Sequence, residues 1–132
     1  MWPLLALGLL GIAAEPPACL PPAPETVTLS GVLERQTSPG PPNYDSIAAG
    51  DAPETYFVLH LDQPVCLSEL PDNPASLIQL VFNSSSAQSY ESLRPSLGQP
   101  MTCHGTLFWW QTGHHHTPIL LTVTSCSAFP PP

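Results

Sequence analysis

Short apolar segments, separated by turn-forming residues, constrain this chain more than any other feature. In a strand, successive side chains point to opposite faces, so the alternation of Val27, Leu29 and Leu33 with less apolar neighbours predicts a half-buried strand. We place strands at residues 26–36, 56–61, 77–82, 101–110 and 117–125. The chain is therefore expected to be mainly β, with five strands.

The spacing of apolar residues changes once, between the third and fourth strands. Tyr90, Leu93 and Leu97 recur at helical spacing, and the serines at 84–86 offer an N-cap, so we expect a helix within residues 84–97. Pro95 should split this helix or end it early, because proline has no backbone N–H.

Five strands with one helix between strands three and four is the order of a small OB-like Greek-key barrel. A six-element sandwich and an SH3-like barrel remain as alternatives. In OB barrels, ligands usually bind at the loops that join strands one to two and strands four to five. Here those loops are residues 37–54, which are rich in proline, and the segment around His114–His116.

Four cysteines in 132 residues predict two disulfides, because a small core gains from cross-links. Four cysteines allow three pairings. If the last two strands form a hairpin centred within the run of histidines, Cys103 and Cys126 lie opposite each other. Cys19 and Cys66 are then left to pair. No Cys-x-x-Cys spacing is present, which argues against zinc bound through sulfur.

Residues 2–14 form an apolar run that ends in small residues. A membrane-spanning helix needs roughly 20 residues, so this run better suits a secretory signal. We expect a signal peptide at 1–14, cleaved after Ala14 or as late as residue 18, and no transmembrane anchor in the mature protein. A proline-rich segment at 15–25, a barrel domain at 26–127 and a proline-rich tail at 128–132 should follow.

This organisation predicts a secreted or periplasmic protein. Two alternatives stay open: a lipoprotein anchor at Cys19, and a cytosolic protein whose N-terminus is simply apolar.

The charge balance narrows the choice of partners. Arg35 and Arg94 are the only Lys or Arg residues, and the formal net charge is −8. Nucleic-acid affinity depends on Lys and Arg, so no nucleic-acid partner is expected, and an anionic membrane surface is equally unfavourable. A metal ion, a sugar or a cationic envelope protein remains as a candidate partner.

The run His114, His115 and His116 is the candidate metal site. Imidazole suits zinc, copper and nickel, so the predicted cofactor is zinc or copper. In an extended chain His114 and His116 point to the same side. A run of histidines in a hairpin can also serve only to hydrogen-bond backbone carbonyls.

The opposite loop could complete such a site. Its candidate binding residues are Tyr44, Asp45, Asp51 and Glu54. We also expect Gly113 to supply a positive-φ turn position.

Trp109 and Trp110 lead into the histidine loop. On alternate faces of a strand, one should be in the core and the other partly exposed, where it could stack on a sugar or on a partner's aromatic group. Plain packing at the barrel rim is the alternative. His60 and His104 are interpreted as ordinary strand residues.

Enzyme signatures are few. The sequence has no Gly-x-Ser-x-Gly, no His-Glu-x-x-His and no phosphate loop. We therefore regard an enzyme as the less favoured reading.

Two motifs carry a resemblance to a known family. They are Pro39-Gly-Pro-Pro-Asn-Tyr-Asp-Ser-Ile47, and Gly105-Thr-Leu-Phe108 followed by Thr112-Gly-His-His-His-Thr-Pro118. With them, the chain from Cys19 to Val123 resembles an uncharacterised bacterial family of short exported proteins, a domain of unknown function.

The resemblance implies the fold, export and the place of the site, and it implies a disulfide between Cys19 and Cys66. Cys103 and Cys126 are not part of the family pattern, and Trp109-Trp110 replaces a His-Ala-like pair. No activity comes with the family.

Three functional hypotheses follow. The first is a periplasmic or envelope ligand-binding module with its site at the histidine loop. The second is a metal-dependent or histidine-assisted enzyme that uses the same residues. The third is a passive structural or interaction protein of the cell envelope.

Overall fold

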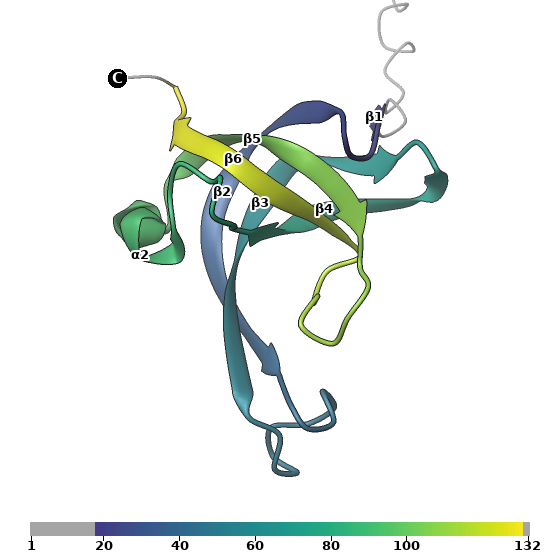
Figure 1. The fold of residues 1–132 in the computed structure, drawn as a ribbon, viewed down its shortest axis with the longest axis vertical. Coiled ribbons are helices and arrows are strands. Elements are labelled where there is room, and N and C mark those ends of the chain that lie inside the picture. The colour runs from purple at the N-terminus through teal and green to yellow at the C-terminus, as the bar shows by residue number, and fades with distance from the viewer. Residues whose placement is uncertain (1–17, 131–132) are drawn as a thin grey trace, which may run out of the picture.

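The computed structural model describes residues 18–130, and the predicted signal peptide lies outside them. The chain is mainly β (Figure 1). Its elements are β1 (Ala18–Leu20), β2 (Thr26–Pro39), β3 (Pro53–Leu67), β4 (Leu70–Val81), α2 (Tyr90–Leu93), the 3₁₀ helix η1 (Arg94–Ser96), β5 (Pro100–Trp109) and β6 (Ile119–Ala128). In the described part of the chain, no helix is long and apolar enough to span a membrane.

All strands belong to one mixed sheet with the order β1-β3-β2-β5-β6-β4. The β1–β3 and β4–β6 pairs are parallel, and the other pairs are antiparallel. β4 also pairs with β3, so the pairings that start at β3 and pass through β2, β5, β6 and β4 return to β3.

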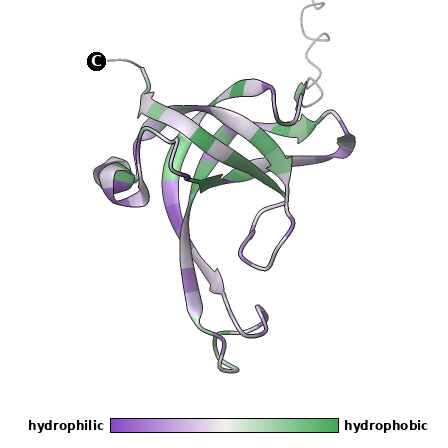
Figure 2. Ribbon diagram, in the orientation of Figure 1, coloured by the Kyte–Doolittle hydropathy of each residue, from purple (hydrophilic) through white to green (hydrophobic). Residues whose placement is uncertain are grey.

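The core lies where the strands overlap. Alternate residues of β2 and β5 are buried in it, whereas β3, β4 and β6 each contribute a run of consecutive buried residues. Figure 2 shows that hydrophobic residues concentrate there, whereas the projecting end of the β2–β3 hairpin is mostly pale or hydrophilic. The fully buried side chains include Leu33, Leu59, Ile78, Leu107 and Leu121.

Both predicted disulfides are present, Cys19–Cys66 and Cys103–Cys126, and the described residues include no free cysteine. Cys103 and Cys126 are paired residues of β5 and β6, as the hairpin argument requires. Nearer the loop, an irregularity after His104 shifts the register by one residue. Between this irregularity and the loop the hairpin is centred on His114, and the shift is what brings Cys103 opposite Cys126.

The prediction of five strands was wrong by one. β1 lies inside the segment expected to be a linker, and it pairs in parallel with the end of β3, with Cys19 opposite Cys66. Three residues carry no readable period, and the partner strand is far away in the sequence. Sequence pattern therefore could not reveal this strand.

The first two predicted strands are longer than expected. β2 continues to Pro39 and β3 begins at Pro53, so the loop between them shortens to residues 40–52. Polar cross-strand contacts replace core packing there: the hydroxyls of Thr37 and Thr55 lie 3.1 Å apart, and those of Ser38 and Tyr56 lie 2.7 Å apart. The hairpin consequently projects beyond the rest of the sheet (Figure 1).

Three further boundaries need correction. The second predicted strand does not end at residue 61, because β3 runs on to Leu67. The third, β4, begins at Leu70 rather than at residue 77, and the β3–β4 register shifts accommodate the added residues. The last strand, β6, begins at Ile119 rather than at Thr117 and ends at Ala128.

The predicted helix is much shorter than residues 84–97. It comprises only α2, followed by η1 with Pro95 in its first turn. Its N-cap is Ser89, which forms a capping box with Ser92, whereas the serines at 84–86 lie in the preceding turn. Leu93 is the buried residue of α2 and anchors it to the core.

Candidate functional site

Two loops that are far apart in the sequence lie next to each other. One is the β2–β3 loop, residues 40–52, and the other is the β5–β6 loop, residues 110–118. They meet because β2 pairs with both β3 and β5, which brings the two hairpins together (Figure 1). Side-chain contacts across this junction define the site.

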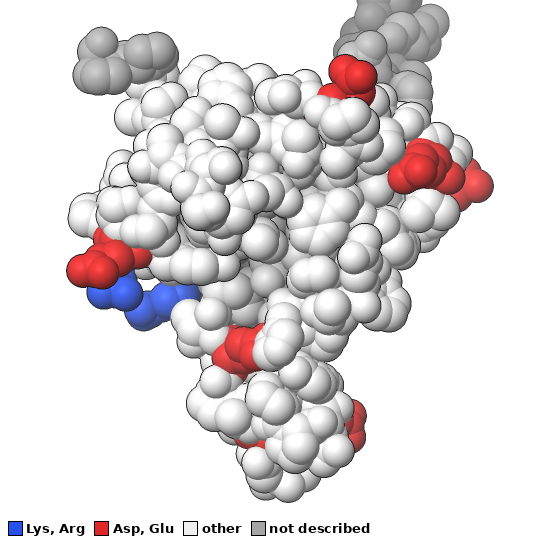
Figure 3. Space-filling view, in the orientation of Figure 1, with Lys and Arg blue, Asp and Glu red and all other residues white. Residues whose placement is uncertain are grey.

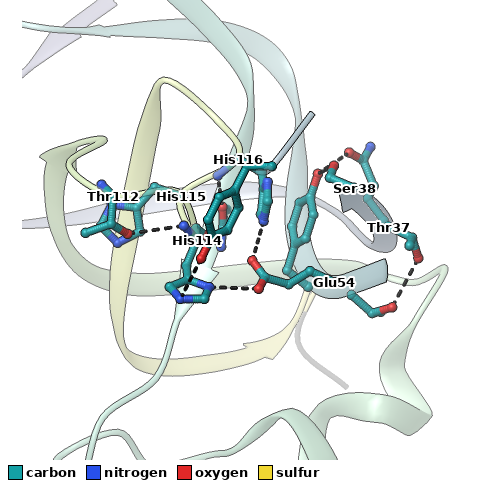
Figure 4. Close-up of polar contacts among 12 residues, drawn as sticks. Thr37, Ser38, Glu54, Thr112, His114, His115 and His116 are labelled. Atoms are coloured by element: carbon teal, nitrogen blue, oxygen red, sulfur yellow. Dashed lines mark hydrogen bonds and ion pairs between the residues drawn. The ribbon is translucent and has the colours of Figure 1, made fainter. Parts of the chain in front are cut away.

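Glu54, at the start of β3, holds the β5–β6 loop through two histidines. Its Oε1 lies 2.6 Å from His116 Nε2, and its Oε2 lies 2.7 Å from His114 Nδ1 (Figure 4). Burial raises the pKa of Glu54, but hydrogen bonds from both histidines and their positive charge outweigh it, and the net pKa is lowered. Glu54 is thus a carboxylate at neutral pH, and both histidine nitrogens donate to it.

The two outer histidines differ in exposure. The His114 side chain is 63% exposed, whereas that of His116 is 9% exposed. His116 stacks on Tyr56 with ring centroids 4.5 Å apart. His116 therefore belongs to the wall of the site, and His114 faces the solvent side.

His115 has a different role. Its Nδ1 accepts hydrogen bonds from the backbone N–H groups of Gln111, at 2.9 Å, and Thr112, at 3.3 Å. Burial, together with the charges of His114 and His116, lowers the pKa of His115. A nitrogen that accepts two N–H groups carries no proton, so His115 is neutral with its proton on Nε2.

Gln79 of β4 fixes the backbone of the histidine loop. Its amide nitrogen donates to the carbonyl of His114 at 3.0 Å, and its Oε1 accepts from the N–H of His116 at 2.6 Å. Its own backbone N–H donates to Thr117 Oγ1 at 3.0 Å. Gln79 is buried away from water, so its polar groups obtain their hydrogen bonds from the loop that they hold.

Sequence reasoning missed Gln79 and the stacking partner Tyr56. A signal for Gln79 exists, because it is the one polar residue in the apolar run from Leu77 to Phe82. A polar side chain buried in such a run needs a partner, which points to a nearby loop.

Tyr44, in the β2–β3 loop, makes a second contact between the two loops, through His114. Its hydroxyl lies 3.2 Å from His114 Nε2, and its ring lies edge-on to that of His114. Tyr44 has φ 54°, a left-handed conformation that is uncommon for a residue other than glycine. The backbone of the loop therefore turns Tyr44 toward the histidines at some conformational cost.

Gly113 is needed for a reason other than the predicted one. Positive φ among the described glycines occurs at Gly50 and Gly98, not at Gly113. A Cβ at Gly113 would instead lie 2.8 Å from ring atoms of Tyr44. The missing side chain lets the Tyr44 ring approach the loop.

The two other acidic candidates do not face the histidines in this way. Asp51 is buried and accepts the backbone N–H groups of Asn43, Asp45 and Ser46 at 2.8–2.9 Å. These backbone hydrogen bonds lower its pKa. Asp51 thus shapes the loop, and Asp45 is exposed at its surface.

A cleft of about 440 Å³ opens between the loops. Trp110 and Tyr44 line it, and these residues are 52% and 37% exposed. Thr112, His115 and His116 supply polar groups to its lining. Trp109, by contrast, packs against the core, so the two tryptophans divide between core and surface as predicted.

The described residues contain no group of three or more His, Cys, Asp or Glu side chains arranged to hold a metal ion. The contacts explain this, because Glu54 already accepts from both histidines and Asp51 accepts from the backbone. A zinc or copper ion would have to displace these hydrogen bonds. The metal site stays a prediction.

Comparison with known proteins adds one finding. Residues 77–127 match the family model described as Domain of unknown function (DUF4431). This stretch begins within β4 and ends within β6, and it contains the second motif of the resemblance but not the first. Over these residues the match confirms a resemblance to a family of unknown function. No curated protein and no solved structure matches the chain.

Proposed function

We propose that this chain is a secreted or periplasmic carbohydrate-binding module built on an OB-type barrel. The observation that carries the proposal is the cleft between the two loops, where two exposed aromatic residues lie beside the hydroxyl of Thr112 and the neutral imidazole of His115. Sugars present both C–H faces and hydroxyls, so they suit a site that combines aromatic faces with a few fixed polar groups.

The strand pairings support the barrel part of the proposal. β2, β3, β4, β5 and β6 take the places of the five predicted strands, and their pairings return to the starting strand. β1 is then an addition at the edge of β3. In such a barrel, loops 40–52 and 110–118 are the ligand-binding loops.

The disulfides support export, because they persist in oxidising compartments and are rare in the cytosol. The charge distribution supports an uncharged ligand. Figure 3 shows basic side chains in one area at the left of the body and acidic groups spread over the visible face. Arg35 lies in β2 and Arg94 in η1, and neither lines the cleft. An anionic ligand would find no Lys or Arg at the cleft.

The cleft proposal is tested by titrating short, uncharged β-1,4-linked oligosaccharides into the mature protein in a calorimeter. Trp110→Ala should weaken binding at least about tenfold, because it removes the most exposed ring of the cleft. Phe129→Ala is the matched control, since Phe129 is 48% exposed and does not line this cleft. Equal losses in both variants, or no binding of any saccharide, would overturn the proposal.

One further observation favours a second candidate, a histidine-assisted enzyme. The Tyr44 hydroxyl, the His114 imidazole and the Glu54 carboxylate form a chain of hydrogen bonds of 3.2 Å and 2.7 Å. Because Glu54 accepts from Nδ1, Nε2 of a neutral His114 is free to accept the Tyr44 proton. This order of hydroxyl, imidazole and carboxylate is the one that activates a nucleophile in hydrolases.

The second candidate predicts selective chemistry at Tyr44. An arylsulfonyl fluoride should form an ester with the Tyr44 oxygen as fluoride leaves and His114 takes the proton. Mass mapping should find Tyr44 modified, and His114→Ala should slow modification of Tyr44 at least about tenfold while leaving the rate at Tyr90 unchanged, because the Tyr90 hydroxyl is hydrogen-bonded to the Leu80 carbonyl instead of to a histidine. An unchanged rate at Tyr44 in His114→Ala would exclude this activity.

A further inference from the structure

A second cavity lies beside the cleft. It measures about 220 Å³, and its lining includes Glu54, Thr55, Tyr90 and His114. His115 lines both cavities, so they adjoin along this residue. Together they extend from Trp110 on the β5–β6 loop to Tyr90 at the start of α2.

The exposed aromatic residues are distributed along this path. The large hydrophobic side chains that are exposed in the described part of the chain are Tyr44, Ile47, Tyr90, Trp110 and Phe129. Three of these residues lie in the linings of the two cavities. Trp110 and Tyr44 line the first cavity, and Tyr90 lines the second.

Tyr90 is held as a rigid platform. Its ring packs edge-on against Phe57 and Phe82, with centroids 5.4 Å and 4.6 Å apart. Its hydroxyl donates to the carbonyl of Leu80 at 3.2 Å, and its ring is still 40% exposed. A ring fixed in this way loses little entropy when a ligand stacks on it.

Polar groups of the second cavity suit a neutral ligand with hydroxyls. The Thr55 side chain is exposed there, and the Glu54 carboxylate accepts hydrogen bonds. No arginine or lysine lines either cavity. The lining thus resembles that of the first cavity in placing an aromatic face beside hydrogen-bonding groups, and it adds the Glu54 carboxylate as an acceptor.

We propose that the second cavity is a further subsite for the same ligand, which is then an oligosaccharide chain of two or more sugar units running from Trp110 past His115 to Tyr90. This inference rests on the proposed carbohydrate function. It adds a minimum length for the ligand, and it identifies Tyr90 as the residue that contacts only the longer oligosaccharides.

The test is a length series of β-1,4-linked N-acetylglucosamine oligomers, from one to four units, titrated into the disulfide-bonded protein. Affinity should rise by about tenfold or more once the chain reaches the second cavity. Tyr90→Ala should remove this rise and leave binding of the single sugar unchanged. Tyr90→Phe keeps the ring and should keep the rise. Melting curves of both variants establish that each is folded.

The outcomes separate the two proposals. If all lengths bind equally and Tyr90→Ala changes nothing, the second subsite is wrong while the carbohydrate function stands. If Tyr90→Phe loses the rise as fully as Tyr90→Ala, the ring is not the contact and the subsite is again wrong. If no oligomer of any length binds, the carbohydrate function itself fails, and the second subsite fails with it.

Discussion

Glu54 and Gln79 determine where the histidines lie, from opposite sides of the loop. Glu54 binds the imidazoles of His114 and His116, and Gln79 binds the backbone of the same two residues. The histidine run therefore does not act as three equal side chains. His114 faces the solvent, His116 forms a wall, and His115 caps backbone N–H groups.

Gln79→Ala should destabilise the protein by about 1–3 kcal/mol, because it leaves the part-buried N–H of His116 and the carbonyl of His114 without partners. Urea unfolding measures the loss. Gln63→Ala is the control, since Gln63 is an exposed glutamine of β3. A change of less than 0.5 kcal/mol, roughly the surface-site level, would show that water replaces the amide and that the loop does not need it.

Gly113→Ala should leave overall stability nearly unchanged but separate the two loops. The new Cβ would lie 2.8 Å from the Tyr44 ring, which is partly exposed and can swing away. The hydrogen bond between Tyr44 and His114 would then be lost, and saccharide binding should weaken. Binding as tight as in the wild type would contradict the close-approach account.

Much of the site could be predicted at the level of elements. The two motifs located both loops, and the strand order placed them at the same end. Glu54, His114 and His116 do meet. Sequence could not show that residues 37–39 and 53–55 continue the strands, because they carry no alternation of apolar side chains and are held by cross-strand contacts between hydroxyls instead of core packing.

At the same scale, Asp51 ties loop 40–52 to itself and makes this loop sensitive to acid. Its pKa is lowered in the folded protein, so its contribution to stability is present above its ordinary value of 3.8 and is lost as the pH falls through the folded pKa. Amide exchange of residues 43–46 should accelerate as the pH is lowered below 3.8, beyond the intrinsic rate.

Asp51→Asn should make the loop mobile already at neutral pH and abolish this acid-dependent opening. Asp45→Asn is the matched control, because Asp45 is exposed in the same loop. If Asp51→Asn retains full protection at neutral pH, the carboxylate is not what orders the loop.

At the scale of the whole molecule, the disulfides hold the ends of a small sheet together. Cys19–Cys66 attaches β1 to β3 across 47 residues, and Cys103–Cys126 links β5 to β6 across 23. The second pairing followed from hairpin register, and the first from elimination and from the family pattern. The strand β1 itself could not be foreseen, because only the disulfide and its distant partner give it a place.

Removing either disulfide by paired Cys→Ala substitutions should cost about 3–4 kcal/mol, since each closes a loop of the unfolded chain. The chain-entropy argument makes the loss of Cys19–Cys66 the larger of the two. Denaturant midpoints of the two double variants give the comparison. A loss of less than 1 kcal/mol for both, well below the usual 2–4 kcal/mol for a disulfide, would mean that the core alone holds the sheet.

The central claim is that loops 40–52 and 110–118 form a single carbohydrate site. Backbone amide NMR shifts, followed while an uncharged β-1,4-linked trisaccharide is added, test it most directly. We expect the amide shifts of both loops to change over the same range of ligand concentration. The amide shifts of residues around Tyr90 should change with them. Changes in only one loop, or changes centred on the separate cavity at Val32 and Phe129, would contradict the claim.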